Sequence, residues 1–145
     1  MNTNQDVVVP LDMGHNPEDL QNLFIQLTGN EKIAVPDIIK LVSATDCYCA
    51  VIEREGRAVA FGALSKFFVP DKGQYIGTIQ SLVTDKQYRG KGFGTKIMTH
   101  LLSHAKTIKL KQVILTSNPK RKAANKLYKQ LGFEKTNTNF FYKNL

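Results

Sequence analysis

A glycine-rich stretch, Arg89-Gly90-Lys91-Gly92-Phe93-Gly94, most constrains what this chain can fold into. It follows an apolar run at residues 79–83 and opens an amphipathic run at residues 93–108. The first turn of a helix has free backbone N–H groups and a positive dipole end. Glycines let a phosphate lie directly on such a backbone, because no Cβ intervenes. The sequence therefore predicts a strand, a turn and a helix start that bind a phosphorylated ligand.

Two common phosphate-binding motifs do not fit the spacing of these glycines. A P-loop needs Gly-x-x-x-x-Gly-Lys-Ser/Thr, and the chain has no such run. A dinucleotide-binding fingerprint needs Gly-x-Gly-x-x-Gly and an acidic residue about 20 residues further on. Here the order is Gly-x-Gly-x-Gly, and no Asp or Glu occurs between Asp85 and Glu134. The spacing argues against both classes.

The pattern that fits is Arg-x-x-Gly-x-Gly, at Arg89, Gly92 and Gly94. It resembles the loop that binds the pyrophosphate of acetyl-CoA in the GNAT family of N-acetyltransferases. A second resemblance to that family lies downstream, where an Asn/Tyr helix (Asn125, Tyr128) ends in Leu-Gly-Phe and follows Thr-Ser-Asn-Pro at residues 116–119. The likeness covers residues 74–142 well and the earlier part of the chain in outline.

The resemblance implies a set of cofactor-binding residues and one catalytic residue. The pantetheine arm of acetyl-CoA should pair with exposed strand backbone, and Asn125 resembles the family's pantetheine-contacting asparagine. Asn118 either hydrogen-bonds that arm or caps the next helix. The expected cofactor-binding residues are Leu82, Val83, Thr84, Arg89, Gly90, Lys91, Gly92, Phe93, Gly94, Thr95, Asn118, Arg121, Asn125 and Tyr128.

Tyr128 matches the tyrosine that is placed in the family to protonate the leaving sulfur of coenzyme A. A phenol has a pKa close enough to that of a thiol for this transfer. The alternative is that Tyr128 is an aromatic residue that only packs in the core. The general base is unassigned, because Gln80 stands where many relatives carry glutamate, and an amide cannot accept the proton. The base could instead be a water chain, a backbone carbonyl or another carboxylate, or the amine could arrive already neutral and need no base.

Periodicity and turn residues predict a mixed α/β order of elements. Asn16-Pro17 fits a helix N-cap with proline at the first helical position, and Gly132 fits a helix stop. The resemblance implies the GNAT fold, a mixed central sheet of about six to seven strands that splays between the fourth and fifth, with about four helices. The expected strands are 7–9, 47–53, 58–67, 75–84, 112–116 and one or two within 133–142, and the expected helices are 17–27, 36–43, 93–108 and 121–131.

Length and composition favour a single domain over residues 1–145. The chain is 42% hydrophobic, has no apolar run long enough to span a membrane, and lacks a secretory pattern in residues 1–12. Cys47 and Cys49 sit two apart in a strand-like run, so both side chains should share one face. With no clustered histidine partner they are expected to be reduced thiols, which favours a cytoplasmic location.

Charge divides the chain into two unequal halves. Residues 1–85 carry 6 Lys/Arg against 11 Asp/Glu, whereas residues 86–145 carry 14 against 1. The basic half suits the phosphates of coenzyme A; nucleic-acid binding is the less favoured alternative, because recognition motifs are missing. The acidic half contains the first two helices and the loop 68–74, which should shape the acceptor pocket and favour a cationic amine.

His100 and His104 are four residues apart, a spacing that can suit a metal. Lys96, Thr99 and Ser103 share their predicted helix face, so we interpret the two histidines as a solvated face and expect no metal.

The combined prediction is an N-acetyltransferase that moves acetyl from acetyl-CoA directly to a primary amine. The alternative is a catalytically silent acyl-CoA-binding or regulatory domain. A homodimer through the aromatic segment 140–142 is also open, because that segment could instead finish the chain's own sheet.

Overall fold

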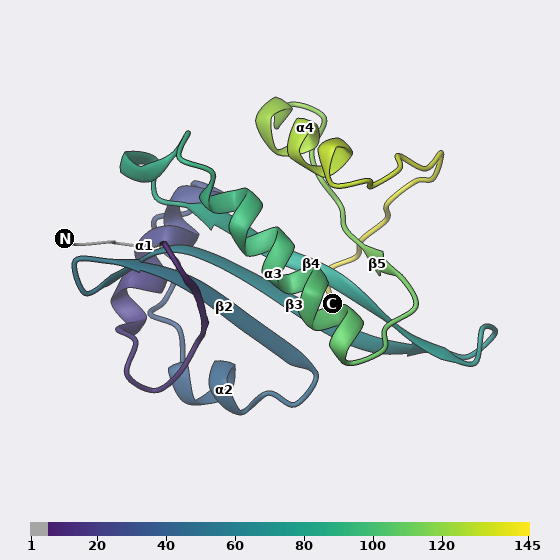
Figure 1. The fold of residues 1–145 in the computed structure, drawn as a ribbon, viewed down its shortest axis with the longest axis horizontal. Helices are drawn as coiled ribbons and strands as arrows, with labels where there is room; N and C mark the ends of the chain where they lie inside the picture. Colours follow the sequence, from purple (N-terminus) through teal and green to yellow (C-terminus); the bar gives the residue numbers. More distant parts are fainter. Residues whose placement is uncertain (1–5) are drawn as a thin grey trace.

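The computed structural model describes residues 6–145, and strands and helices follow one another much as the sequence predicts (Figure 1). Asn16 caps the first helix by accepting a hydrogen bond from the Glu18 N–H at 2.9 Å, and Gly132 adopts a left-handed conformation after the last helix. The elements are β1 (Val8–Pro10), α1 (Pro17–Thr28), α2 (Ile38–Ser43), β2 (Cys47–Arg54), β3 (Arg57–Val69), β4 (Gln74–Thr84), the 3-10 turn η1 (Lys86–Tyr88), α3 (Phe93–Thr107), β5 (Val113–Ile114) and α4 (Lys122–Gln130).

The five strands form one sheet in the order β1-β2-β3-β4-β5, antiparallel except for the parallel pair β4–β5. Helix α3 covers one face, and α1 and α2 lie on the other, which makes three layers (Figure 1). The α3 side buries Phe93, Ile97 and Leu101 against the sheet, whereas the α1 side buries Leu20 and Leu23. Successive side chains of β2 and β3 point to opposite faces of the sheet and so contribute to both cores, as expected for strands that are covered on both faces.

Within the described residues the sheet has five strands, fewer than the six to seven expected, because residues 133–142 form none. Phe140, Phe141 and Tyr142 are 74%, 84% and 81% exposed. The segment before them, Glu-Lys-Thr-Asn-Thr-Asn, carries no apolar side chain that could bury itself against a sheet face. The neighbouring strand β5 is only two residues long, so it offers a short edge for pairing.

The expected separation of the fourth and fifth strands is confirmed. β4 pairs with β5 only through Gly77–Val113 and Thr78–Ile114. Among residues 6–145, no strand pairs with the rest of β4, up to Thr84, on that side. The backbone of this part of β4 is therefore open to a ligand.

Helix α3 approaches β3 closely at Gly62. A Cβ at this position would lie 2.5 Å from Cγ2 of Ile97 and 3.1 Å from Cδ1 of Leu101, both fully buried. We expect Gly62→Ala to lower the free energy of unfolding by about 1–3 kcal/mol, the usual cost of overpacking. Urea denaturation of the variant and the wild type measures this difference. Gly94→Ala is the matched control, because its Cβ makes an ordinary 3.4 Å contact with Leu127. Equal stability of the two variants would contradict this account of the packing.

In the part of the chain that the structure describes, no helix is long and apolar enough to cross a membrane.

Candidate active site

A cleft of about 960 Å³ opens where β4 and β5 separate. Its walls are the end of β4, the glycine-rich turn with the start of α3, and α4; the end of α1 also contributes. Figure 1 shows α4 held away from the sheet above this opening. The three segments that the sequence motifs singled out therefore meet at one place.

A bulge in β4 shapes the inner end of the cleft. Phe61 pairs with Val83 and Ala63 with Gln80, so Gly62 faces two residues of β4. Ser81, one of the two, has a φ of 56°, which lies in the left-handed region. A bulge bends its strand and leaves one residue unpaired. Here it turns the backbone of β4 just before Leu82, where the lining of the cleft begins.

The glycine-rich turn presents an uncapped helix start to the cleft. Gly92 is the N-cap of α3 with a φ of 82°, and no side chain caps the helix. A Cβ built on Gly92 or on Gly90 would meet no protein atom within 4 Å. The free N–H groups and the dipole of the 15-residue helix α3 therefore point into open space that an anion can fill.

The side chains of Arg89 and Asp85 hold this turn to the sheet and to α1. The Arg89 Nε donates to the backbone oxygen of Thr84 at 3.1 Å. Asp85 is buried, and its carboxylate accepts from the Gln87 N–H at 2.9 Å and from the side-chain amides of Asn22 and Gln26 at 3.4 and 3.3 Å. No local sequence pattern marks Asp85, because its partners on α1 lie about 60 residues away along the chain.

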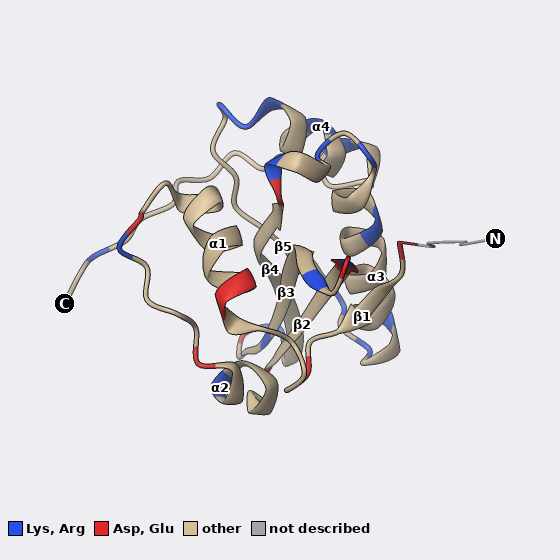
Figure 2. Cartoon of the chain, turned by 90° about the vertical axis from the view of Figure 1, so that its left-hand side faces the viewer, with Lys and Arg blue, Asp and Glu red and all other residues tan. Residues whose placement is uncertain are grey.

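Basic side chains surround the cleft. Figure 2 shows Lys and Arg gathered on α4 and on the turn before it, whereas acidic residues mark the start of α1. Arg89, Arg121, Lys122 and Lys126 line the cleft itself. The excess of Lys and Arg in the C-terminal half of the sequence therefore forms a basic rim around the cleft.

Most of the expected cofactor-binding residues line this cleft. The residues that do so are Leu82, Val83, Thr84, Arg89, Gly90, Gly92, Phe93, Gly94, Thr95 and Arg121. Lys91, Asn118, Asn125 and Tyr128 are outside the lining. Residues that the sequence analysis missed also line it, namely Gln26, Leu27, Tyr88, Lys122, Ala123, Ala124, Lys126, Leu127 and Gln130. The helical period of α4 could have pointed to Lys122, Lys126 and Gln130, whereas nothing local marks Gln26 or Leu27.

The two asparagines organise the turn that precedes α4. The Asn118 Oδ1 accepts from the Lys120 N–H at 2.9 Å, and the Asn125 Nδ2 donates to the backbone oxygen of Asn118 at 3.0 Å. Asn118 therefore closes the turn before α4 and does not cap the helix itself, whose N-cap Arg121 has no side-chain hydrogen bond. Both side chains thus hold α4 in place beside the cleft.

Tyr128 lies on α4 with only 7% of its surface exposed, in the same core cluster as the cleft residues Leu82 and Phe93. Its ring meets that of Phe133 edge-on at 6.1 Å between centroids. Burial raises the pKa of the Tyr128 phenol, opposed in part by the charge of Arg121. The hydroxyl therefore keeps its proton throughout the neutral range, as a proton donor must.

The interpretation of His100 and His104 as a solvated face is wrong. Both are half-buried on α3 against Tyr48, whose hydroxyl lies 2.7 Å from the His100 Nε2. The His104 ring stacks on that of Tyr48 at 3.8 Å between centroids. Burial lowers the pKa of each histidine, and His100 lowers that of His104 further. Within residues 6–145, no group of three His, Cys, Asp or Glu side chains is arranged to hold a metal.

The chain belongs to the acetyltransferase (GNAT) family, whose model matches residues 18–133. Solved structures with the same fold include an acetyltransferase from Trypanosoma brucei (20% identity, 94% of this chain and 98% of that one, TM-score 0.79). Glucosamine-6-phosphate N-acetyltransferase from Arabidopsis thaliana is similar at 22% identity, with 94% and 96% coverage and a TM-score of 0.72.

An aminoglycoside acetyltransferase from an uncultured soil metagenomic sample is similar at 18% identity, with 95% of each chain covered and a TM-score of 0.80. No curated protein matches the chain. At these identities the structural neighbours establish the fold, and the family match establishes the class of enzyme.

Proposed function

We propose that this protein is an acetyl-CoA-dependent N-acetyltransferase that moves the acetyl group directly to a primary amine. The observation that carries the proposal is the cleft itself, where open β4 backbone, an uncapped helix start and a basic rim converge. We further propose that residues 1–145 act as one such domain.

The residues of the cleft fit the three parts of coenzyme A. The open backbone of residues 82–84 can pair with an extended pantetheine arm, as an added strand would. The space beside Gly92, which a Cβ would enter, suits a pyrophosphate on the N–H groups of α3. Arg121, Lys122 and Lys126 supply positive charge for the remaining phosphate.

Bound there, acetyl-CoA supplies a thioester carbonyl that an amine can attack. Backbone N–H groups at the bulge in β4 would hold that carbonyl and polarise its oxygen. Tyr128 supplies the proton for the departing thiolate, because its buried phenol stays protonated.

A primary amine is the acceptor class that agrees with the relatives. Two of the neighbours named above are acetyltransferases of glucosamine-6-phosphate and of aminoglycosides, and both compounds carry amines. The acidic N-terminal half, with 11 Asp/Glu against 6 Lys/Arg, favours a cationic acceptor.

The proposal is tested by mixing the protein with acetyl-CoA and a panel of polyamines, amino sugars and peptide amines, and following free thiol and acetylated product. Saturable turnover of at least one amine is expected. Tight binding of acetyl-CoA without turnover of any amine would favour the silent acyl-CoA-binding domain.

Selectivity for the 3′-phosphate of coenzyme A should follow from the basic rim. Dephospho-coenzyme A should bind more weakly than coenzyme A, because Lys122 and Lys126 lose a phosphate to pair with. The difference should shrink as salt rises, since exposed charges are screened. Calorimetric titrations at low and high salt measure it. Equal binding of the two at low salt would show that the basic rim serves another ligand.

A further inference from the structure

A bridge of two side chains fastens the C-terminal end of α1 to the segment 85–92 between β4 and α3, the cofactor turn. The Gln26 Oε1 accepts from the Lys86 N–H at 2.9 Å, and the Gln26 Nε2 donates to the Asp85 Oδ2 at 3.3 Å. The other carboxylate oxygen of Asp85 accepts from the Gln87 N–H at 2.9 Å. The amide of Gln26 therefore meets two consecutive residues of the turn, one through its acceptor and one through its donor.

Asp85 anchors this bridge inside the protein, with only 6% of its surface exposed. Its backbone N–H donates to the Val59 oxygen at 2.8 Å, and its backbone oxygen accepts from the Tyr88 N–H at 2.8 Å. Asn22, one helical turn before Gln26, donates a second side-chain amide to the carboxylate at 3.4 Å. A buried carboxylate requires such donors, so the shape of the cofactor turn depends on the amides that α1 supplies.

The cofactor turn carries groups that the proposed cofactor would contact. Gly92 ends the turn as the uncapped N-cap of α3, and Arg89 lines the cleft. Gln26 also lines the cleft, whereas Asp85 is not among its lining residues. A substitution at Asp85 can therefore affect a ligand in the cleft through the position of the turn and through long-range charge, but not through direct contact.

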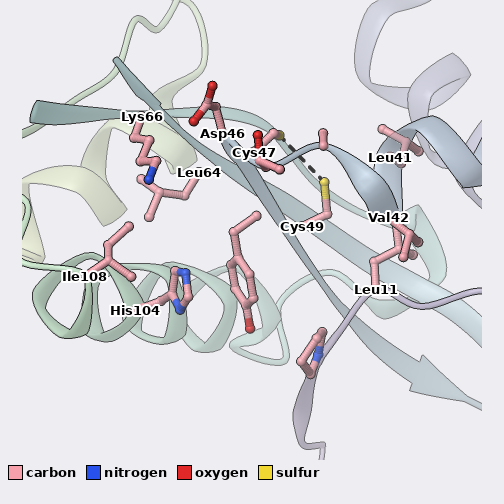
Figure 3. Close-up of a pocket in the computed structure, with 14 residues that line it drawn as sticks. Leu11, Leu41, Val42, Asp46, Cys47, Cys49, Leu64, Lys66, His104 and Ile108 are labelled. Atoms are coloured by element: carbon pink, nitrogen blue, oxygen red, sulfur yellow. Dashed lines mark hydrogen bonds between the residues drawn. The ribbon is translucent and has the colours of Figure 1, made fainter. Parts of the chain in front are cut away.

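Helix α2 meets the same face of the sheet through apolar side chains. Leu41 and Val42 line a separate cavity of about 300 Å³, and Figure 3 shows them on the side of β2 that carries the sulfur atoms of Cys47 and Cys49. Leu41 packs against the core beneath α1 and α2. This contact lies away from the cofactor cleft, so a substitution in it supplies a control for general loss of packing.

We propose that Gln26 and Asp85 are positioning residues for the cofactor turn, and that acetyl-CoA binding is linked through them to the packing of α1. The inference rests on the proposed binding of acetyl-CoA in the cleft. The bridge holds the turn against α1 and thereby sets where the N–H groups at the start of α3 meet the pyrophosphate. Because α1 is expected to shape the acceptor pocket, the bridge joins the cofactor side of the site to the acceptor side. The linkage is reciprocal, so a bound cofactor stabilises the bridge as much as the bridge improves binding.

The test is a double-mutant cycle of acetyl-CoA dissociation constants, measured by calorimetry for the wild type, Asp85→Asn, Gln26→Glu and the double variant. Asp85→Asn should weaken binding about fivefold or more, because its new amide donor faces the amide donors of α1. Gln26→Glu should also weaken binding, because two carboxylates then face each other. The double variant places an acceptor opposite a donor again, so it should bind about fivefold or more tightly than Gln26→Glu alone.

This reversal of sign separates positioning from direct contact and from charge. Gln26→Glu and the double variant carry the same side chain in the wall of the cleft, so its own effect on the cofactor is equal in both. Loss of the Asp85 charge alone would favour an anionic ligand in either background, so it cannot produce opposite effects. In the wild type, acetyl-CoA should also slow hydrogen exchange of the Lys86 amide, and Asp85→Asn should remove most of that protection.

Asp19→Ala is the matched control on α1. The Ala58 N–H donates to the Asp19 Oδ2 at 3.1 Å, which ties the start of the same helix to β3. Leu41→Ala is the corresponding control on α2. Both variants should melt at a lower temperature than the wild type, yet their dissociation constants for acetyl-CoA should stay within about twofold of the wild-type value.

Wild-type affinity of Asp85→Asn, or an effect of this substitution that is equal in both backgrounds, would overturn the inference and leave the proposed function standing. So would a loss of affinity in Asp19→Ala as large as that in Asp85→Asn, because the cleft would then respond to any loosening of α1. If Asp85→Asn does not fold alone, binding by the double variant that is no tighter than that of Gln26→Glu overturns the inference. A folded wild-type protein without measurable affinity for acetyl-CoA would remove both the inference and the proposed function.

Discussion

Replacing Tyr128 with phenylalanine is expected to lower kcat about 100-fold, the usual loss when a general acid is removed. The ring and its edge-on contact with Phe133 remain, so stability should change little. The residues that line the cleft also remain, so the dissociation constant of acetyl-CoA should stay nearly the same. Because burial raises the pKa of this phenol, the wild type should lose no activity through its ionisation between about pH 6 and 9. Steady-state kinetics with calorimetry measure both quantities.

Tyr88→Phe is the matched control for this prediction. Tyr88 lines the cleft, stacks on Phe93 at 6.1 Å between ring centroids, and also carries a hydroxyl. The variant should turn over at nearly the wild-type rate. Wild-type turnover by Tyr128→Phe would instead make Tyr128 a packing residue. A large loss in Tyr88→Phe alone would move the role of proton donor to Tyr88.

The strand, glycine-rich turn and helix start that line the cleft could be predicted from the sequence because their signals are local. Arg89, Gly92 and Gly94 fall within one turn and one helix start, so their spacing fixes their geometry. The separation of β4 from β5 followed from the family resemblance, and the register of two residue pairs confirms it. The signals for the start of α1 at Asn16 and for the end of α4 at Gly132 are equally local.

The proton-handling side could not be predicted, since it depends on contacts between strands. Ser65 reaches Gln80, which stands where a carboxylate base was expected, only after β3 and β4 take their register. The solvent exposure of His100 and His104 was predicted wrongly, because the helical pattern did not show that the side chain of Tyr48 would cover them. One or two strands were expected within residues 133–142, yet the polar residues 134–139 give this segment nothing to bury against a sheet.

Gly92→Val is expected to weaken acetyl-CoA binding at least about tenfold, which corresponds to about 1.4 kcal/mol. Its branched side chain would enter the space where the proposed pyrophosphate meets the backbone of α3, since no protein atom lies within 4 Å of the added Cβ. The φ of 82° also disfavours any residue with a Cβ, so the variant carries backbone strain. Calorimetric titration with acetyl-CoA measures the loss of affinity, and a separate variant is needed to account for the strain.

Gly56→Val supplies that comparison, because Gly56 has a φ of 74°, equally open surroundings and no place in the cleft. The most direct test of the account is therefore the dissociation constant of acetyl-CoA for the wild type, Gly92→Val and Gly56→Val, each shown to be folded by its thermal melt. We predict wild-type affinity for Gly56→Val and at least about a tenfold loss for Gly92→Val. Equal affinity of all three proteins would contradict the assignment of this cleft to the cofactor.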